Sequence, residues 1–172
     1  MQLTHLDFAM GTNKPGFDLL LIGHVACALA GFGALVTSGV QATRLGRAGP
    51  GGAGETLLGY FAPGVNWVGR ALYGVPLLGL ALLADSGGQD KIGETWVIAG
   101  LSLWTLAALL AEGFLWPAER RIQSALVDAV STGTGGRFPA PVRRDCRVVG
   151  LLGAVAAAIF LVATVLMVAR PR

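Results

Sequence analysis

Two ionisable side chains, Arg70 and Glu112, interrupt apolar stretches of this 172-residue chain. A charge in hydrocarbon is costly, so it normally faces a partner, a bundle interior, or a proton or substrate path. At 1.5 Å per helical residue, Arg70 lies about 21 Å from Ala84 and Glu112 about 26 Å from Thr95. We therefore predict a structural ion pair that holds two consecutive helices in register. The alternatives are a proton or substrate path through Glu112 and an unpaired Arg70 that reaches the headgroups.

Three more polar side chains lie on the helical faces that carry this pair. Ser102 and Thr105 precede Glu112 by ten and seven residues, spacings that place all three on one face of a helix. Tyr73 lies one turn from Arg70. We predict a polar seam between the two helices, formed by Tyr73, Ser102 and Thr105, that acts as interhelical glue.

The chain has two histidines, His5 and His24. His24 lies about 9 Å inside an apolar stretch, at 1.5 Å per residue, and shares a face with small residues, so we expect a hydrogen-bonded packing histidine. The alternative is ligation of haem b by His24, with His5 or a methionine opposite. We otherwise expect no cofactor. No metal site is predicted, because Cys and His do not cluster at metal-binding spacings.

The motifs of common catalytic sites are missing from the sequence. No glycine-rich loop ends in Lys-Ser or Lys-Thr, which argues against a nucleotide-phosphate site. Ser38 lacks the histidine and acid that would activate it as a nucleophile. We predict no catalytic residues and a protein that is not an enzyme.

Composition places these residues in a membrane. Hydrophobic residues make up 53% of the chain and charged residues 13%, against about 25% charged in soluble domains. Apolar stretches long enough to span a bilayer occupy 17–42, 67–84, 95–116 and 148–168. We expect a single membrane domain over 1–172, all-α, folded as an integral membrane antiparallel four-helix bundle in the lipid bilayer.

The basic residues indicate how the chain crosses the membrane. Connections 43–66 and 117–147 carry eight arginines, and the opposite side carries four basic residues. Because cytoplasmic loops are rich in Lys and Arg, we predict a cytoplasmic basic loop at 117–147 and a multi-pass protein of the cytoplasmic membrane with both termini outside. Within it, 117–130 is predicted to lie on anionic headgroups as a surface helix. No nucleic-acid partner is expected, because no nucleic-acid motif accompanies the arginines.

The second and fourth spans have distinctive packing residues. Pro76 lacks an N–H group, so it leaves the carbonyl of Leu72 without its helical donor and is predicted to kink the second span. The fourth span has the small-xxx-small spacing that allows tight helix contact. We expect this face to contact another subunit; it consists of Gly150, Gly153, Ala154 and Ala157.

A family resemblance is carried by LLLIGHVACALAGFGALV, VPLLGLALL, WPAERRI with the basic loop after it, and the ending LMVARPR. Over residues 17 to 171 the chain resembles a bacterial family of predicted integral membrane proteins of unknown function, whose members close on Met-Val-x-Lys-Pro; Arg170 stands at the lysine position. A more distant similarity runs to copper-resistance D membrane domains and to cytochrome b561-like bundles. Paired intramembrane histidines are missing here, so the resemblance implies the fold and carries over neither haem binding nor copper handling.

For the function, we expect a non-catalytic accessory or scaffold subunit of a larger membrane assembly, such as an electron-transfer complex. Its partners would be other membrane subunits or further copies of the chain. The absence of catalytic motifs and the nearly featureless fourth span lead to this interpretation. The alternatives are a haem-binding electron carrier that uses His24 and a small proton-coupled transporter that uses Glu112 and Arg70.

Overall fold

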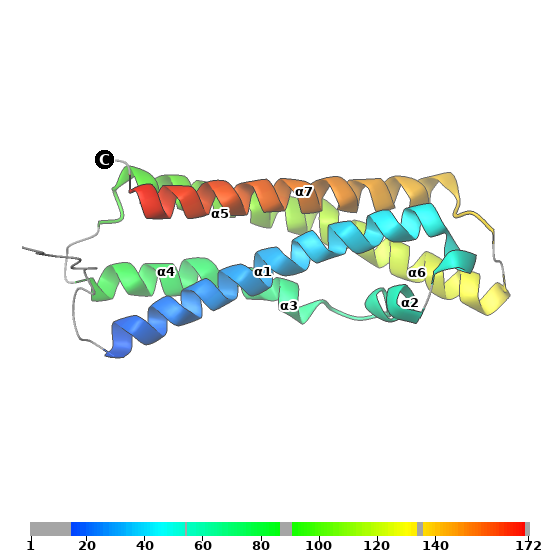
Figure 1. The fold of residues 1–172 in the computed structure, drawn as a ribbon, viewed down its shortest axis with the longest axis horizontal. Coiled ribbons are helices and arrows are strands. Elements are labelled where there is room, and N and C mark those ends of the chain that lie inside the picture. Colours follow the sequence, from blue (N-terminus) through cyan, green and yellow to red (C-terminus); the bar gives the residue numbers. More distant parts are fainter. Residues whose placement is uncertain (1–14, 54, 87–90, 134–135, 171–172) are drawn as a thin grey trace, which may run out of the picture.

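Four long helical segments alternate in direction and form an antiparallel bundle (Figure 1). The computed structural model describes residues 15–53, 55–86, 91–133 and 136–170, and the regular structure within these ranges is helical. The segments, in chain order, are α1 (Pro15–Ala48); α3, η2 and α4 (Trp67–Arg70, Ala71–Tyr73, Gly74–Asp85); α5, η3 and α6 (Thr95–Leu110, Ala111–Leu115, Trp116–Thr132); and α7 (Ala140–Ala169).

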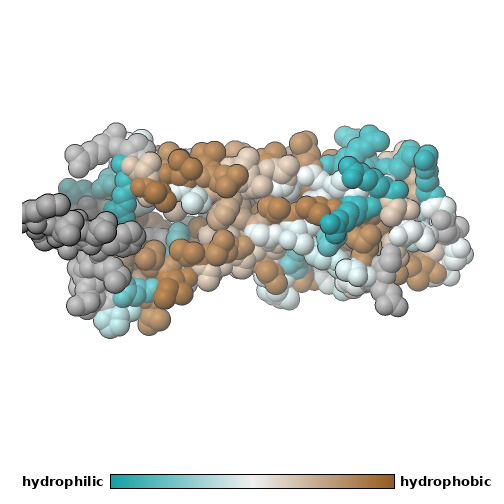
Figure 2. All heavy atoms as spheres, in the orientation of Figure 1, coloured by the Kyte–Doolittle hydropathy of each residue, from teal (hydrophilic) through white to brown (hydrophobic). Residues whose placement is uncertain are grey.

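The surface of the bundle suits lipid. Each of the four segments is long and apolar enough to cross a membrane. Apolar side chains gather over the part of the bundle that holds α4 and the end of α7, and polar ones gather at the opposite end (Figure 2). A continuous apolar surface of this kind is costly in water and favourable in hydrocarbon. The predicted fold class, an all-α membrane bundle, is therefore confirmed.

The helices extend beyond the predicted spans. The predicted helix at 117–130 is present as α6, which continues the third segment, and α7 already begins at Ala140, so the connection between them is shorter than predicted. The prediction that α6 lies on headgroups is wrong, because Ile122 and Leu126 are buried in the core and α6 packs against α7 and η1 (Pro50–Gly52). The sequence suggested a surface helix because an apolar stripe looks alike whether it covers lipid or protein.

α1 and α7 pack closely where glycines meet. A Cβ atom on Gly153 would lie 2.7 Å from the Cα of Gly39, and one on Gly150 would lie 2.5 Å from Thr43 Oγ1. Only a missing side chain allows the backbones to approach this closely. The small face of α7, which was predicted to contact another subunit, is thus largely used within the chain. Of its members, Ala154 is exposed.

α1 also packs against the second segment. A Cβ atom on Gly31 would lie 2.5 Å from the backbone nitrogen of Leu72, and one on Gly74 would lie 2.6 Å from Cys27 Sγ. α4 therefore packs mainly on α1, and α5 mainly on α7. The second and third segments, predicted to be neighbours, are joined by the long side chains of Arg70, Glu112 and Trp104 rather than by close backbone packing.

We predict that Gly153→Ala destabilises the bundle, because its methyl group would overlap Gly39. Overpacking of this kind costs about 1–3 kcal/mol. Gly33→Ala is the matched control, since a Cβ atom there meets nothing within 4 Å and alanine favours a helix. Thermal unfolding in mild detergent should show a lower midpoint for the first variant and an equal or higher one for the second. Equal midpoints for both variants would contradict the close contact.

Candidate functional site

Arg70, Tyr73 and Glu112 form a polar cluster where the second segment approaches the η3 turn. Arg70 Nη1 lies 2.6 Å from Glu112 Oε1, and the Tyr73 hydroxyl donates to the same oxygen. Arg70 Nη1 also donates to the Tyr73 oxygen, at 3.5 Å. The structure thus brings the two predicted charges together and places Tyr73 between the helices, as the seam hypothesis required.

Aromatic rings support the cluster. The Arg70 guanidinium lies 3.7 Å from the ring centroid of Trp116, and Trp116 itself is buried. The Tyr73 ring contacts both Trp104 and Trp116 at centroid distances of 6.5 and 6.3 Å. Arg70 therefore has a carboxylate on one side and an aromatic face on the other, and both interactions offset the loss of water around the charge.

The cluster faces the outside of the bundle. The side chain of Arg70 is 28% exposed and that of Glu112 is 50% exposed. Glu112 is therefore a surface group of the isolated chain rather than a lining of its interior. At 1.5 Å per residue it lies about 26 Å from the start of α5, within a hydrocarbon layer of about 30 Å.

A widened helical turn positions Glu112. Residues Ala111–Leu115 form a π-helical turn, in which the Trp116 N–H donates to the carbonyl of Ala111. Pro117 follows, and a proline ring clashes with the carbonyl four residues earlier in an α-helix. The wider turn moves that carbonyl away, so α5 continues into α6 through the proline. Turns of this type often occur at functional sites.

The carbonyl of Leu72, which Pro76 leaves without a helical donor, is satisfied from the neighbouring helix. Trp104 Nε1 donates to it at 2.8 Å. The residues before Pro76 form a short 3₁₀ turn, Ala71–Tyr73, as expected where the α-helical ladder is broken. An unsatisfied carbonyl in a membrane core costs several kcal/mol, so this indole is a major link between the second and third segments.

The predicted seam is wrong for Ser102 and Thr105. Their hydroxyls donate to the carbonyls of Ile98 and Leu101, each at 2.8 Å and within the same helix. Both residues are exposed. The reason is geometric: the face of α5 that carries them points away from α4, which packs on α1 instead.

His24 joins α1 to α4. Its Nδ1 lies 2.9 Å from the carbonyl oxygen of Val75, and its ring lies close to Gly79, where a Cβ atom would be 3.2 Å from Cε1. This is the hydrogen-bonded packing role that was predicted for His24. His5 lies outside the described residues.

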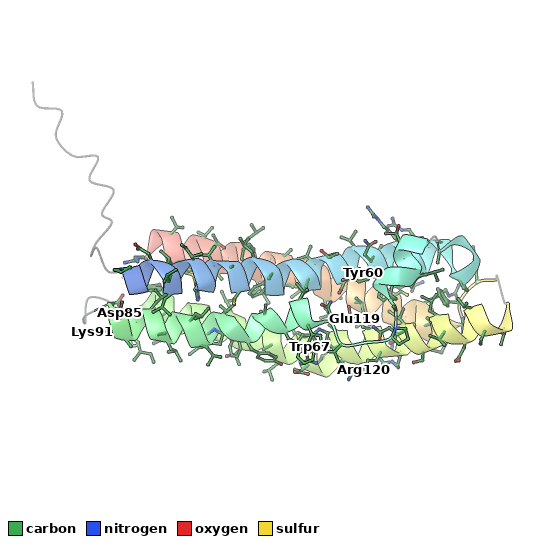
Figure 3. All side chains as sticks on the ribbon, turned by 90° about the horizontal axis from the view of Figure 1, so that it is seen from below. Tyr60, Trp67, Asp85, Lys91, Glu119 and Arg120 are labelled. Atoms are coloured by element: carbon green, nitrogen blue, oxygen red, sulfur yellow. The ribbon has the colours of Figure 1, made fainter. Side chains whose placement is uncertain are left out.

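Buried polar side chains next to the cluster were not predicted. Ser38 Oγ lies 2.7 Å from the Tyr60 oxygen, and Ser38 and Glu119 are both buried, at 1% and 6% exposed. Tyr60 lies at the end of α2 (Glu55–Tyr60). Asn66 Oδ1 accepts the Gly69 N–H at 3.1 Å and caps α3. Tyr60 and Glu119 lie close to each other midway along the bundle (Figure 3).

Burial raises the pKa of Tyr60, which keeps its hydroxyl protonated in the contact with Ser38. Either oxygen of this pair can act as the donor. A signal for the buried carboxylate was present in the sequence, because Glu119 lies on the same helical face as Ile122 and Leu126.

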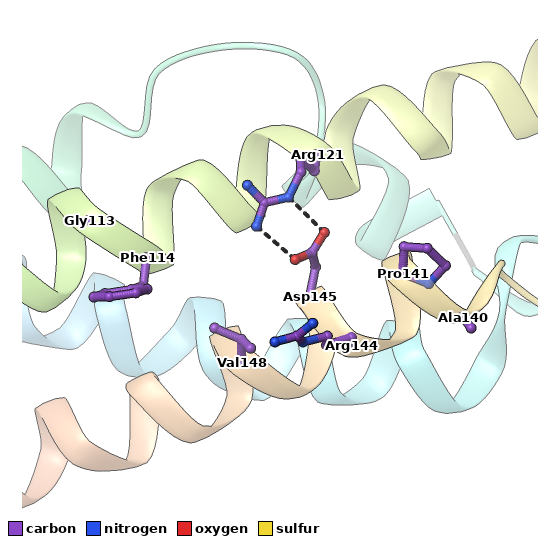
Figure 4. Close-up of a pocket in the computed structure, with 8 residues that line it drawn as sticks. All are labelled: Gly113, Phe114, Arg121, Ala140, Pro141, Arg144, Asp145 and Val148. Carbon is purple, nitrogen blue, oxygen red and sulfur yellow. Dashed lines mark hydrogen bonds and ion pairs between the residues drawn. The ribbon is translucent and has the colours of Figure 1, made fainter.

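A second ion pair joins α6 to α7. Arg121 Nε donates to Asp145 Oδ2 at 2.9 Å and Nη2 donates to Oδ1 at 2.8 Å, a bidentate geometry (Figure 4). Such pairs are stronger and more directional than single contacts. This pair was not predicted, since the partners are 24 residues apart and the predicted surface helix was not expected to pack against the fourth span.

We predict that Trp104→Phe lowers the free energy of unfolding by about 1–3 kcal/mol, because it leaves the Leu72 carbonyl without its donor. Adding Pro76→Ala restores a backbone donor for that carbonyl and should recover part of the loss. Trp96→Phe is the matched control, since the Trp96 indole donates to Glu94 at the outer end of α5; a change within about 0.5 kcal/mol is expected there. Detergent unfolding measures all three. If the double variant recovers none of the lost stability, the unsatisfied Leu72 carbonyl is not the cause of the destabilisation.

Comparison with known proteins supports the membrane fold. The comparisons with curated proteins and with solved structures found no match. The family model described as "Predicted integral membrane protein (DUF2269)" matches residues 18–171, nearly the whole of the chain. The match confirms the resemblance to a family of predicted integral membrane proteins of unknown function. With its four apolar helices, the chain belongs to this family of predicted integral membrane proteins.

Proposed function

We propose that the protein is a non-catalytic accessory or scaffold subunit, with both termini outside the cytoplasmic membrane, that binds another membrane protein through α5. The observation that carries this proposal is the exposure of Glu112, half of whose side chain lies on the outside of the bundle. Lipid tails offer this carboxylate no hydrogen bond, so its exposure to lipid is energetically unfavourable. A protein partner that covers Glu112 removes this unfavourable exposure.

The exposed face of α5 has the spacing of a helix-packing seam. Its members alternate at four and three residues, the repeat with which one helix packs along another at a shallow angle. Three of the five members are polar, which disfavours lipid and favours a protein neighbour. The five members, all exposed, are Ile98, Ser102, Thr105 and Leu109 of α5 and Glu112 of the η3 turn that continues it.

Glu112 also indicates the chemistry of the partner. Arg70 and Tyr73 both donate to Oε1, so Oε2 has no donor among the described residues. The occupant we propose is a transmembrane helix of another subunit with a hydrogen-bond donor at this depth. The hydroxyls of Ser102 and Thr105 bond their own helix, and their oxygens can accept further hydrogen bonds from the same partner.

Site-directed photocrosslinking in native membranes tests this proposal. A photoreactive phenylalanine analogue replaces Leu109 on the seam or, as the matched control, Leu161 on α7; the two are 65% and 64% exposed. We expect one discrete crosslinked product from position 109 and none from 161. Glu112→Gln should lower the yield at position 109 at least fivefold, because the partner loses its acceptor.

The mass and the position dependence of the crosslinked products distinguish the possible outcomes. A crosslink of twice the chain's mass identifies the partner as a second copy and contradicts a different subunit. Equal products from positions 109 and 161, or none from either, would refute the seam as a binding surface.

A haem-binding electron carrier is a second candidate, and the orientation of His24 favours it. If Nδ1 carries the proton, it donates to the Val75 carbonyl and leaves Nε2 as the basic nitrogen. Histidines that bind a metal commonly donate their other N–H to a carbonyl in this way. His24 would supply one axial ligand, and a bound haem would supply one-electron transfer.

The absorption spectrum of protein expressed with excess haem tests this candidate. We expect a Soret band that is lost in His24→Ala and retained in Cys27→Ala, a change on the same face of α1 one turn away. A spectrum without a Soret band removes the candidate and leaves the packing role of His24 intact.

A further inference from the structure

A hollow lies between α6 and α7 at the polar end of the bundle (Figure 4). Its volume is about 660 Å³, enough for a phosphate group and part of an attached chain. One part of the wall is charged and the other is apolar. The lining residues are Gly113, Phe114, Arg121, Ala140, Pro141, Arg144, Asp145 and Val148.

The charged part of the hollow holds a net positive charge. Arg121 uses Nε and Nη2 for Asp145, so its Nη1 stays available to a further acceptor. Arg144 is exposed and has no hydrogen-bond or ion-pair partner within the described ranges. Two guanidinium groups against one carboxylate leave one positive charge, and both guanidinium groups extend to the side of Phe114 and Val148 (Figure 4).

Two apolar residues of the hollow, Phe114 and Val148, lie on its membrane side. Phe114 is 59% exposed and precedes Arg121 by seven residues, toward α5. Counting 1.5 Å per residue from Arg170 along α7, Val148 lies at about 33 Å and Arg144 at about 39 Å. Hydrocarbon is about 30 Å thick and the headgroups extend the bilayer to about 40–45 Å. The arginines therefore lie at headgroup level and the apolar residues at the edge of the acyl chains.

We propose that this hollow binds one anionic phospholipid from the leaflet that the charge distribution predicts to be cytoplasmic. Arg144 and Nη1 of Arg121 bind the phosphate, and an acyl chain lies over Phe114 and Val148. Basic pockets between helices at this level suit anionic headgroups. The Arg121–Asp145 pair orients the first guanidinium and leaves the second unneutralised, which makes a single negative charge the matching ligand.

The apolar wall distinguishes a lipid from a free anion. An exposed phenylalanine beside the anion site adds nothing to the binding of inorganic phosphate, whereas it contacts the chain of a phospholipid. The site is on the α6–α7 side of the bundle and does not depend on the partner proposed for α5.

Lipid binding to the full chain in detergent micelles tests the proposal, with native mass spectrometry as the readout. The probes are dioctanoyl phosphatidylglycerol, dioctanoyl phosphatidylcholine, glycerol phosphate and inorganic phosphate. We expect one retained phosphatidylglycerol, bound at least tenfold more tightly than phosphatidylcholine, and no displacement by millimolar phosphate. Arg144→Gln should weaken phosphatidylglycerol binding at least fivefold.

Arg147→Gln is the matched control, since Arg147 is an exposed arginine of the same helix and does not line the hollow; less than a twofold change is expected. Phe114→Ala should weaken the dioctanoyl lipid more than it weakens glycerol phosphate. Equal losses in Arg144→Gln and Arg147→Gln would show a diffuse basic surface and overturn the site. Displacement by inorganic phosphate would show a free-anion site and overturn the lipid.

Discussion

Lipid supplies no hydrogen bonds, so each polar group at membrane depth must find its partner within protein. The second segment has two polar groups that need such a partner, the Leu72 carbonyl and the Arg70 guanidinium. Trp104 Nε1 donates to the carbonyl at 2.8 Å, and Glu112 pairs with the guanidinium at 2.6 Å. Both partners come from the third segment. Long polar side chains therefore connect two helices whose backbones pack mainly on other neighbours.

The close packing of the bundle depends on glycine instead. α1 contacts α7 at Gly39 and Gly153 and contacts the second segment at Gly31, so it is the helix on which the others are arranged. The same core also holds polar groups, because Ser38 and Glu119 are buried and the half-buried Tyr60 contacts Ser38. Close contacts at glycines and a few directed hydrogen bonds therefore hold the bundle together.

Features that depend on the length and periodicity of apolar stretches could be predicted from the sequence, whereas the direction in which each helix face points could not. The lengths of the apolar stretches identified the four spans, and the rise per residue placed Arg70 and Glu112 at a similar depth. These two side chains meet because the inner ends of their helices are adjacent. Ser102 and Thr105 were assigned to the same interface because they share a face with Glu112, but α5 is turned so that this face points outward. The small residues of α7 were predicted to contact another subunit for the same reason. A sequence shows which residues share a face of a helix, but it does not show which element lies opposite that face.

The π turn has a consequence for the continuous third segment. If this turn became an ordinary α turn, everything beyond it would rotate by about 100°, the angle per residue of an α-helix. Such a rotation would carry Glu119, which is 6% exposed, out of the core and would separate Arg121 from Asp145. The wide turn therefore sets the rotational position of α6 on which both contacts depend.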